Sequence, residues 1–234
     1  MKIYDEVIKN ISALVSSSAP ITLDKSSAWN ETDQNKIIFK NETAFELGES
    51  SLYSLSGIML TSSISLVKDD EIVLIGQDLN EIKKDTPYAR IVLARVNDKL
   101  MGEGNAIYQN IRKIDYTRYH IFPEGFMMRI SSMNQRETVR VSSKALKKGM
   151  NFSSVGQLFI DKYKSHPAVE AVKIIFINTD DFNYDELSKL LVRTENITKA
   201  LDHLVNKVKM DCHSCALQVV CNEVENMVKE DFKK

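Results

Sequence analysis

The feature that most constrains the fold is the run from Ala171 to Ile177, seven residues of which only Lys173 is polar. Its length and its content of β-branched and aromatic residues are typical of a β-strand. Three similar stretches precede it in the chain, at residues 52–61, 71–75 and 90–96. The middle of the chain is therefore expected to build a β-sheet.

Segments with a helical repeat of apolar residues alternate with these strand-like runs. Residues 3–15, 103–118 and 152–165 each place their apolar side chains on one helical face. A longer helix is expected to open at Asn183, where the sequence resembles a capping box. Its apolar stripe continues from Leu187 to Val208.

Shorter segments connect these elements. Residues 20–35 are polar and are expected to form a loop, and Lys36 to Phe39 is a short strand candidate. Asp69-Asp70 lies between two strand-like runs and predicts a hairpin turn. Residues 126–131 and 138–141 are interpreted either as strands or as an irregular segment that faces a ligand.

These patterns together predict an α+β or mixed α/β fold, because helices and strands interleave and hairpin signals occur. We expect a central mixed sheet with flanking helices and a long C-terminal helix followed by a cysteine-rich segment. The predicted parts are an N-terminal helix and loop over 1–35, an α/β core over 36–180 and a C-terminal segment over 181–234. At 234 residues they are expected to form one globular unit.

Composition excludes several classes of function. The chain carries 31 basic and 32 acidic residues, and this balance argues against a general electrostatic binder of nucleic acid. No apolar run approaches the roughly 20 residues needed to span a bilayer, and the N-terminus lacks the pattern of a signal peptide. We therefore expect a cytoplasmic protein that binds neither membrane nor nucleic acid.

All three cysteines, Cys212, Cys215 and Cys221, lie within ten residues near the C-terminal end. Free cysteines that merely fill a core would be scattered, whereas tightly spaced thiolates are typical ligands of zinc and of iron–sulfur clusters. Such a site requires four ligands, and His213 and Asp211 are neighbouring candidates for the fourth. The alternative is three reduced cysteines that pack on or beside an amphipathic helix.

Helix geometry restricts how the three thiolates could meet. Cys212 and Cys215 share a face if this segment is helical, but Cys221 lies about 240° further round a regular helix. Either the helix breaks near Cys215, or one cysteine is not a ligand. Three cysteines with histidine would suit zinc, and three cysteines with an exogenous or partner ligand would suit an iron–sulfur cluster.

A second candidate site is a basic segment in which Arg129, Arg136 and Arg140 recur within twelve residues. Guanidinium groups match phosphates bidentately, so these residues are candidates for binding a phosphate or CoA. The alternative is a solvated basic face whose arginines pair with Glu124 and Glu137.

The same region carries a resemblance to a known family. The stretch from Glu124 to Ile177, with Gln-Arg-Glu, Val-Arg-Val-Ser and Lys-Ala-Leu-Lys-Lys-Gly, resembles the middle domain of acetyl-CoA synthase. That protein is the β subunit of the CO dehydrogenase/acetyl-CoA synthase complex. Phe45 to Gly48 and Asp69 to Asp78 are similar to flanking elements of the family. Asp211-Cys212-x-x-Cys215 falls where the family begins the cysteines of its nickel–iron–sulfur A-cluster, so the resemblance spans residues 36–221.

The resemblance implies both shared and missing parts. Arg140 matches the family's arginine and Arg136 its Gln-Arg pair, which implies some character of a CoA site. The family has a tryptophan two residues before that arginine, where this chain has Thr138. The third cysteine, Cys221, comes earlier than in the family, a fourth is missing, and so are the nickel-holding Cys-Gly-Cys motif and its domain. The resemblance thus implies a short relative that cannot build the full A-cluster alone.

Three functions follow as hypotheses. The first is a protein of anaerobic one-carbon metabolism that binds a metal centre, expected to be iron–sulfur, through Cys212, Cys215 and Cys221. A corrinoid protein, a CO dehydrogenase-type partner or a second copy of the chain would supply what is missing. The second is a non-catalytic interaction protein that holds zinc or no metal. The third is a CoA-dependent acyl or methyl transferase that uses the three arginines.

Overall fold

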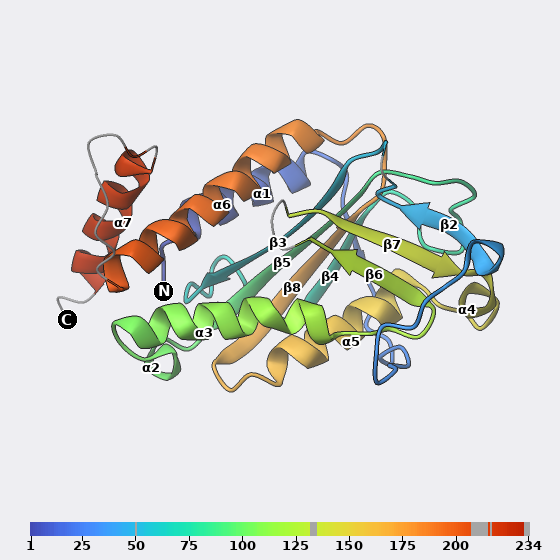
Figure 1. Cartoon of the computed structure of the whole chain (residues 1–234), viewed down its shortest axis with the longest axis horizontal. Coiled ribbons are helices and arrows are strands. Elements are labelled where there is room, and N and C mark those ends of the chain that lie inside the picture. Colours follow the sequence, from blue (N-terminus) through green and yellow to red (C-terminus); the bar gives the residue numbers. More distant parts are fainter. Residues whose placement is uncertain (50, 132–134, 207–214, 216, 232–234) are drawn as a thin grey trace.

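The computed structural model describes residues 1–49, 51–131, 135–206, 215 and 217–231 of the chain. The strands are β1 (Ile21–Leu23), β2 (Thr43–Leu47), β3 (Ser54–Thr61), β4 (Glu71–Ile75), β5 (Tyr88–Val96), β6 (Phe126–Ile130), β7 (Glu137–Ser142) and β8 (Val169–Ile177). The helices are α1 (Asp5–Ser16), α2 (Asp98–Met101), α3 (Asn105–Tyr116), α4 (Ser143–Lys147), α5 (Phe152–Lys164), α6 (Tyr184–Val205) and α7 (Gln218–Asp231). Two sheets with flanking helices and a C-terminal helix confirm the α+β prediction (Figure 1).

The larger sheet has five strands in the order β1-β4-β8-β5-β3. β4 and β8 are parallel, as are β3 and β5, whereas β5 runs antiparallel to β8 and β1 antiparallel to β4. The apolar run 171–177, which most constrains the fold, lies within β8 at the centre of this mixed sheet. Its apolar side chains are buried on both faces of the sheet.

Helices cover both faces of the larger sheet. On one face α5 approaches so closely that a Cβ on Gly156 would lie 2.9 Å from Ile72 Cγ2. On the other face α6 lies over β3, where a Cβ on Gly57 would lie 2.5 Å from Leu191 Cδ2. α1 runs beside α6 (Figure 1), and α3 also contacts α6. The core therefore lies in two layers, one on each side of the sheet.

The smaller sheet has the order β2-β7-β6 and is antiparallel throughout. It joins the larger sheet through Ser54 of β3, whose hydroxyl donates to the Glu137 carbonyl over 2.7 Å and accepts from the Glu137 amide over 3.1 Å. Of the predicted segments 126–131 and 138–141, all residues except Ser131 lie in strands rather than in an irregular segment.

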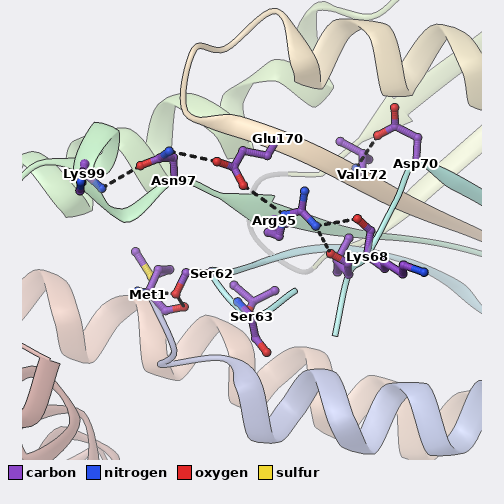
Figure 2. Close-up of polar contacts among 12 residues, drawn as sticks. Met1, Ser62, Ser63, Lys68, Asp70, Arg95, Asn97, Lys99, Glu170 and Val172 are labelled. Atoms are coloured by element: carbon purple, nitrogen blue, oxygen red, sulfur yellow. Dashed lines mark hydrogen bonds and ion pairs between the residues drawn. The ribbon is translucent and has the colours of Figure 1, made fainter. Parts of the chain in front are cut away.

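The ends of β5 and β8 are held by a polar network (Figure 2). Arg95 donates to the carbonyls of Val67 and Lys68 and to the Glu170 carboxylate. Asp70 accepts from the Val172 amide over 3.0 Å. These contacts tie the 62–70 connection to the sheet end and fix where β4 begins.

Three local predictions were wrong. Asp69-Asp70 does not form a hairpin turn, because β3 and β4 are not neighbours in the sheet: β8 and β5 lie between them. Lys36 to Phe39 is not a strand, and the strand lies instead at 43–47. Residues 20–35 are not entirely a loop, because Ile21–Leu23 adds a short edge strand to β4.

The long helices agree closely with their sequence patterns. α1, α3 and α5 begin and end within two residues of the predicted segments. Asn183 caps α6 as predicted, accepting from the Glu186 amide over 3.1 Å. Val208, at the end of the predicted apolar stripe, lies outside the described residues. Within the part of the chain that the structure describes, no helix has the length and apolar composition to cross a membrane.

Candidate functional site

The cysteine segment lies where two C-terminal helices are separated. α6 ends at Val205 and α7 begins at Gln218, so the two helices are distinct. α7 packs back on α6 (Figure 1), with Val224 buried and Glu223 paired to Arg193 over 3.4 Å. The interruption satisfies the condition that helix geometry set for convergence of the three thiolates.

Two of the three cysteines are described. Cys215 is a half-buried free thiol just before α7, and its carbonyl accepts from the Gln218 amide over 3.1 Å. Cys221 is half-buried in the first turn of α7, where it packs against the core. The other predicted ligand, Cys212, and the two candidate fourth ligands, His213 and Asp211, lie outside the described residues. Among the residues that are described, no three His, Cys, Asp or Glu side chains gather as a metal site.

The donor chemistry of the segment fits a thiolate-ligated metal but not the complete centre of the family. Cys215 is a free thiol, and the thiolate is the form of cysteine that binds metals. The whole chain has three cysteines, and a four-iron cluster or a tetrahedral zinc ion needs four ligands. A metal here would therefore be held by three thiolates and one further group.

The predicted arginines lie on the smaller sheet. Arg140 of β7 stands opposite Glu46 of β2, and its Nε donates to the Glu46 carboxylate over 2.8 Å. Its Nη1 donates to the Ile38 carbonyl over 3.2 Å. Two donors of the Arg140 guanidinium are therefore held by the protein, which positions the remaining part of the group.

Arg129 and Arg140 share one face of the smaller sheet. Arg129 pairs in register with Thr138, which lies two residues before Arg140, so the three side chains point to the same side. Arg129 is exposed and Arg140 is partly buried. Arg136 lies just before β7 and is half-buried, and its carbonyl accepts from the Ser131 amide. The face thus presents one exposed guanidinium and one anchored guanidinium.

The predicted partners of these arginines pair elsewhere. Glu124 lies 2.7 Å from Lys148, and this ammonium group lowers the pKa of the Glu124 carboxyl. Glu137 is fully buried and binds Arg90 of β5 through two contacts: Nε to Oε1 over 2.8 Å, and Nη2 to Oε2. The alternative in which these arginines pair with Glu124 and Glu137 is therefore wrong, because Glu124 pairs with Lys148 and Glu137 points into the core.

The Arg90–Glu137 pair is a feature that sequence reasoning missed. Arg90 opens the apolar run 90–96, and its guanidinium is buried 4.4 Å from the centre of the Phe159 ring. Burial and the nearby Glu137 charge raise the pKa of Tyr88 well above its usual value. The signal in the sequence was an arginine within the largely apolar strand β5.

A second missed cluster lies on α3. Asp115 is buried on the same helical face as Ile111 and Ile114, and Arg112 and Arg118 each approach it to 3.2 Å. Its signal in the sequence was a carboxylate within an apolar stripe, with an arginine three residues before it and another three residues after it. The cluster lines a cleft between α3 and α6.

The chain is an α+β protein with two separate candidate sites. One is the basic face of the smaller sheet, and the other is the C-terminal segment that carries the cysteines. The family model for the CO dehydrogenase/acetyl-CoA synthase complex beta subunit matches residues 27–182, which is about two thirds of the chain. The chain belongs to this family and is an acetyl-CoA-synthase-like protein. No curated protein matches its sequence.

The matched region confirms the central part of the resemblance but not its full extent. It includes strands β2 to β8 and the three arginines, and it excludes α1, β1, α6 and α7. The cysteines lie beyond residue 182, so their correspondence to the family's cluster ligands stays a prediction.

Proposed function

We propose that this acetyl-CoA-synthase-like chain binds an iron–sulfur cluster through Cys212, Cys215 and Cys221 and serves CO dehydrogenase-linked one-carbon metabolism. The observation that carries the proposal is the separation of α6 from α7, which frees Cys215 from the helix that bears Cys221. A single continuous helix would have held the thiolates on different faces.

The missing fourth ligand defines the second part of the proposal. A three-thiolate site leaves one position for a group from a partner, a second copy of the chain or a small molecule. A partner of the CO dehydrogenase type is supported by membership in a family named for that complex. A corrinoid protein or a homodimer would meet the same chemical need.

Anaerobic purification followed by reconstitution with iron and sulfide tests the cluster. The expected result is a brown protein with visible charge-transfer absorption, iron and acid-labile sulfide. Cys215→Ser and Cys221→Ser should each lower the iron content, while Ser214→Ala, a neighbouring change that spares the thiolates, should not. A colourless, iron-free protein after reconstitution would overturn the proposal, and stoichiometric zinc without visible absorption would favour the zinc-binding interaction protein instead.

A second function, CoA binding, is favoured by the shared face of Arg129 and Arg140. The exposed Arg129 is available to a phosphate, and Glu46 holds Arg140 in a fixed orientation beside it. Equilibrium titration with CoA should show saturable binding that Arg129→Gln weakens about tenfold, as expected for loss of a charge-assisted contact. Lys189→Gln, on the exposed surface of α6, is the matched control. Absence of saturable binding would exclude this function.

A further inference from the structure

The larger sheet has an open edge at β3. The Tyr88 amide donates to the Tyr53 carbonyl, and in a parallel pair this contact fixes which backbone groups of β3 face β5. The odd-numbered residues 55, 57 and 59 direct their amides and carbonyls to β5. The even-numbered residues, among them Ile58 and Leu60, direct theirs to the open side.

Both ends of this edge are closed by the chain itself. The Ser56 amide donates to the Gln135 carbonyl over 2.7 Å, and the Ser62 amide donates to the Met1 carbonyl over 2.7 Å (Figure 2 shows Met1 beside Ser62). Between them, the outward amides and carbonyls of Ile58 and Leu60 have no hydrogen-bond partner among the described residues. At about 3.3 Å per residue, this gap accommodates an extended segment of roughly four residues.

The open edge lines a cleft of about 320 Å³ between α3 and α6. Ser56, Ile58 and Leu60 lie along it, and Leu60 is buried. The Ser56 hydroxyl is also buried and has no hydrogen-bond partner among the described residues. Unpaired polar groups in a buried setting are costly, so the edge favours an occupant that supplies complementary donors and acceptors.

The two walls of the cleft carry opposite net charge. On the α3 wall Arg112 and Arg118 share the single carboxylate of Asp115, which leaves one positive charge in excess. On the α6 wall the charged side chains that line the cleft, among the residues that the structure describes, are Glu195, Lys199 and Asp202, which leave one negative charge in excess. α6 covers the face of β3 that bears Gly57, and α3 runs along the opposite face (Figure 1).

We propose that the β3 edge binds an extended peptide segment of a partner protein, added as a short strand, with an acidic and a basic residue at adjacent positions. Successive side chains of a strand point to opposite faces of a sheet. A strand paired to Ile58 and Leu60 therefore directs one side chain to the positive α3 wall and the next to the negative α6 wall, in either chain direction. Main-chain hydrogen bonds hold the segment and the alternating charges select it.

Two blocked peptides of identical composition test the charge pattern. Acetyl-Val-Glu-Lys-Val-amide places its charges on opposite faces, and acetyl-Val-Glu-Val-Lys-amide places them on the same face. Titrated into isotopically labelled full-length protein, the first should shift the amide resonances of Ile58 and Leu60 saturably and bind about fivefold more tightly than the second. No shift at these amides at millimolar peptide, or equal binding of the two peptides, would overturn the proposal.

Backbone methylation tests the strand pairing itself. In a strand, alternate amides face the same neighbour, so methylating residues 1 and 3 of the first peptide blocks one edge and methylating residues 2 and 4 blocks the other. One of these two peptides should lose binding by about tenfold, and the other should retain it. Loss in both, or in neither, would contradict strand addition.

A charge-reversal variant tests the α3 wall. Arg112 is largely exposed, so Arg112→Glu leaves the core packing intact while making that wall net negative. It should weaken the first peptide about fivefold, whereas Lys189→Glu on the outer surface of α6 should not change its affinity. Unchanged binding by Arg112→Glu would contradict the proposed selection of charge. The cysteines are not involved, so this test is independent of metal binding.

Discussion

At the scale of single residues, the buried ion pair between Arg90 and Glu137 joins the two sheets. Glu137→Gln leaves the Arg90 charge buried without its counter-charge, so the free energy of unfolding should fall by about 3–5 kcal/mol. Urea denaturation measures this change. The matched control is Glu46→Gln, which breaks the partly exposed pair with Arg140 and should cost about 1 kcal/mol or less. Equal costs for the two variants would contradict the assigned role of burial.

His166 provides a pH-dependent residue in the turn before β8. Burial and the nearby Lys113 charge lower its pKa below 6.5, and its Nδ1 accepts from the Ala168 amide over 3.2 Å. The unfolded chain therefore binds the proton more readily, and stability should fall as the pH drops below about 6.5 towards the folded-state pKa. His166→Asn keeps an acceptor but removes the titration, so its unfolding free energy should depend less on pH between 7.5 and 5. Chemical denaturation at several pH values measures the difference, and an identical slope would contradict it.

At the scale of elements, α7 has one fully buried apolar side chain among its described residues, and several half-buried ones beside it. Val224 is its buried contact against α6, and most of its other described side chains are half-buried or exposed. Val224→Ser should therefore release α7 by local opening, increasing hydrogen exchange of its amides at least tenfold while the β8 amides keep their protection. Val219→Ser, at an exposed position of the same helix, is the control. Equal protection of α7 in wild type and Val224→Ser would show that other contacts hold it.

The position of β2 shows that the local sequence pattern does not determine where a short strand forms. Residues 37–39 are apolar, but Ile37 and Phe39 are largely exposed, and only Ile38 is buried beside Met127. The strand forms instead at 43–47, where Phe45 and Leu47 face the core and Glu46 meets Arg140 across the register. A tertiary partner, β7, decided between two short segments of comparable strand character.

At the scale of the whole molecule, the region matched by the family model is not expected to fold alone. Residues 27–182 lack α1 and α6, which cover one face of the larger sheet. Their removal would expose Leu55, Met59, Ile91 and Leu93, side chains that are buried in the full chain. The fragment should lack a cooperative thermal transition in circular dichroism, whereas the chain truncated after Val205 should retain one. A cooperative fragment 27–182 would instead support the division into separate parts at 36–180.

Sequence alone determined the long helices, the four central strands, the fold class and the family, because these depend on apolar periodicity and on motifs continuous in the chain. It also set the condition that the helix must be interrupted near Cys215 if all three cysteines bind one metal centre. The tertiary structure decided which strands are neighbours, which arginine meets which carboxylate, and that the β3 edge stays open between two walls of opposite charge. These properties depend on contacts between residues distant in sequence, such as Arg90 with Glu137 and Ser56 with Gln135, whose free energy no local pattern contains.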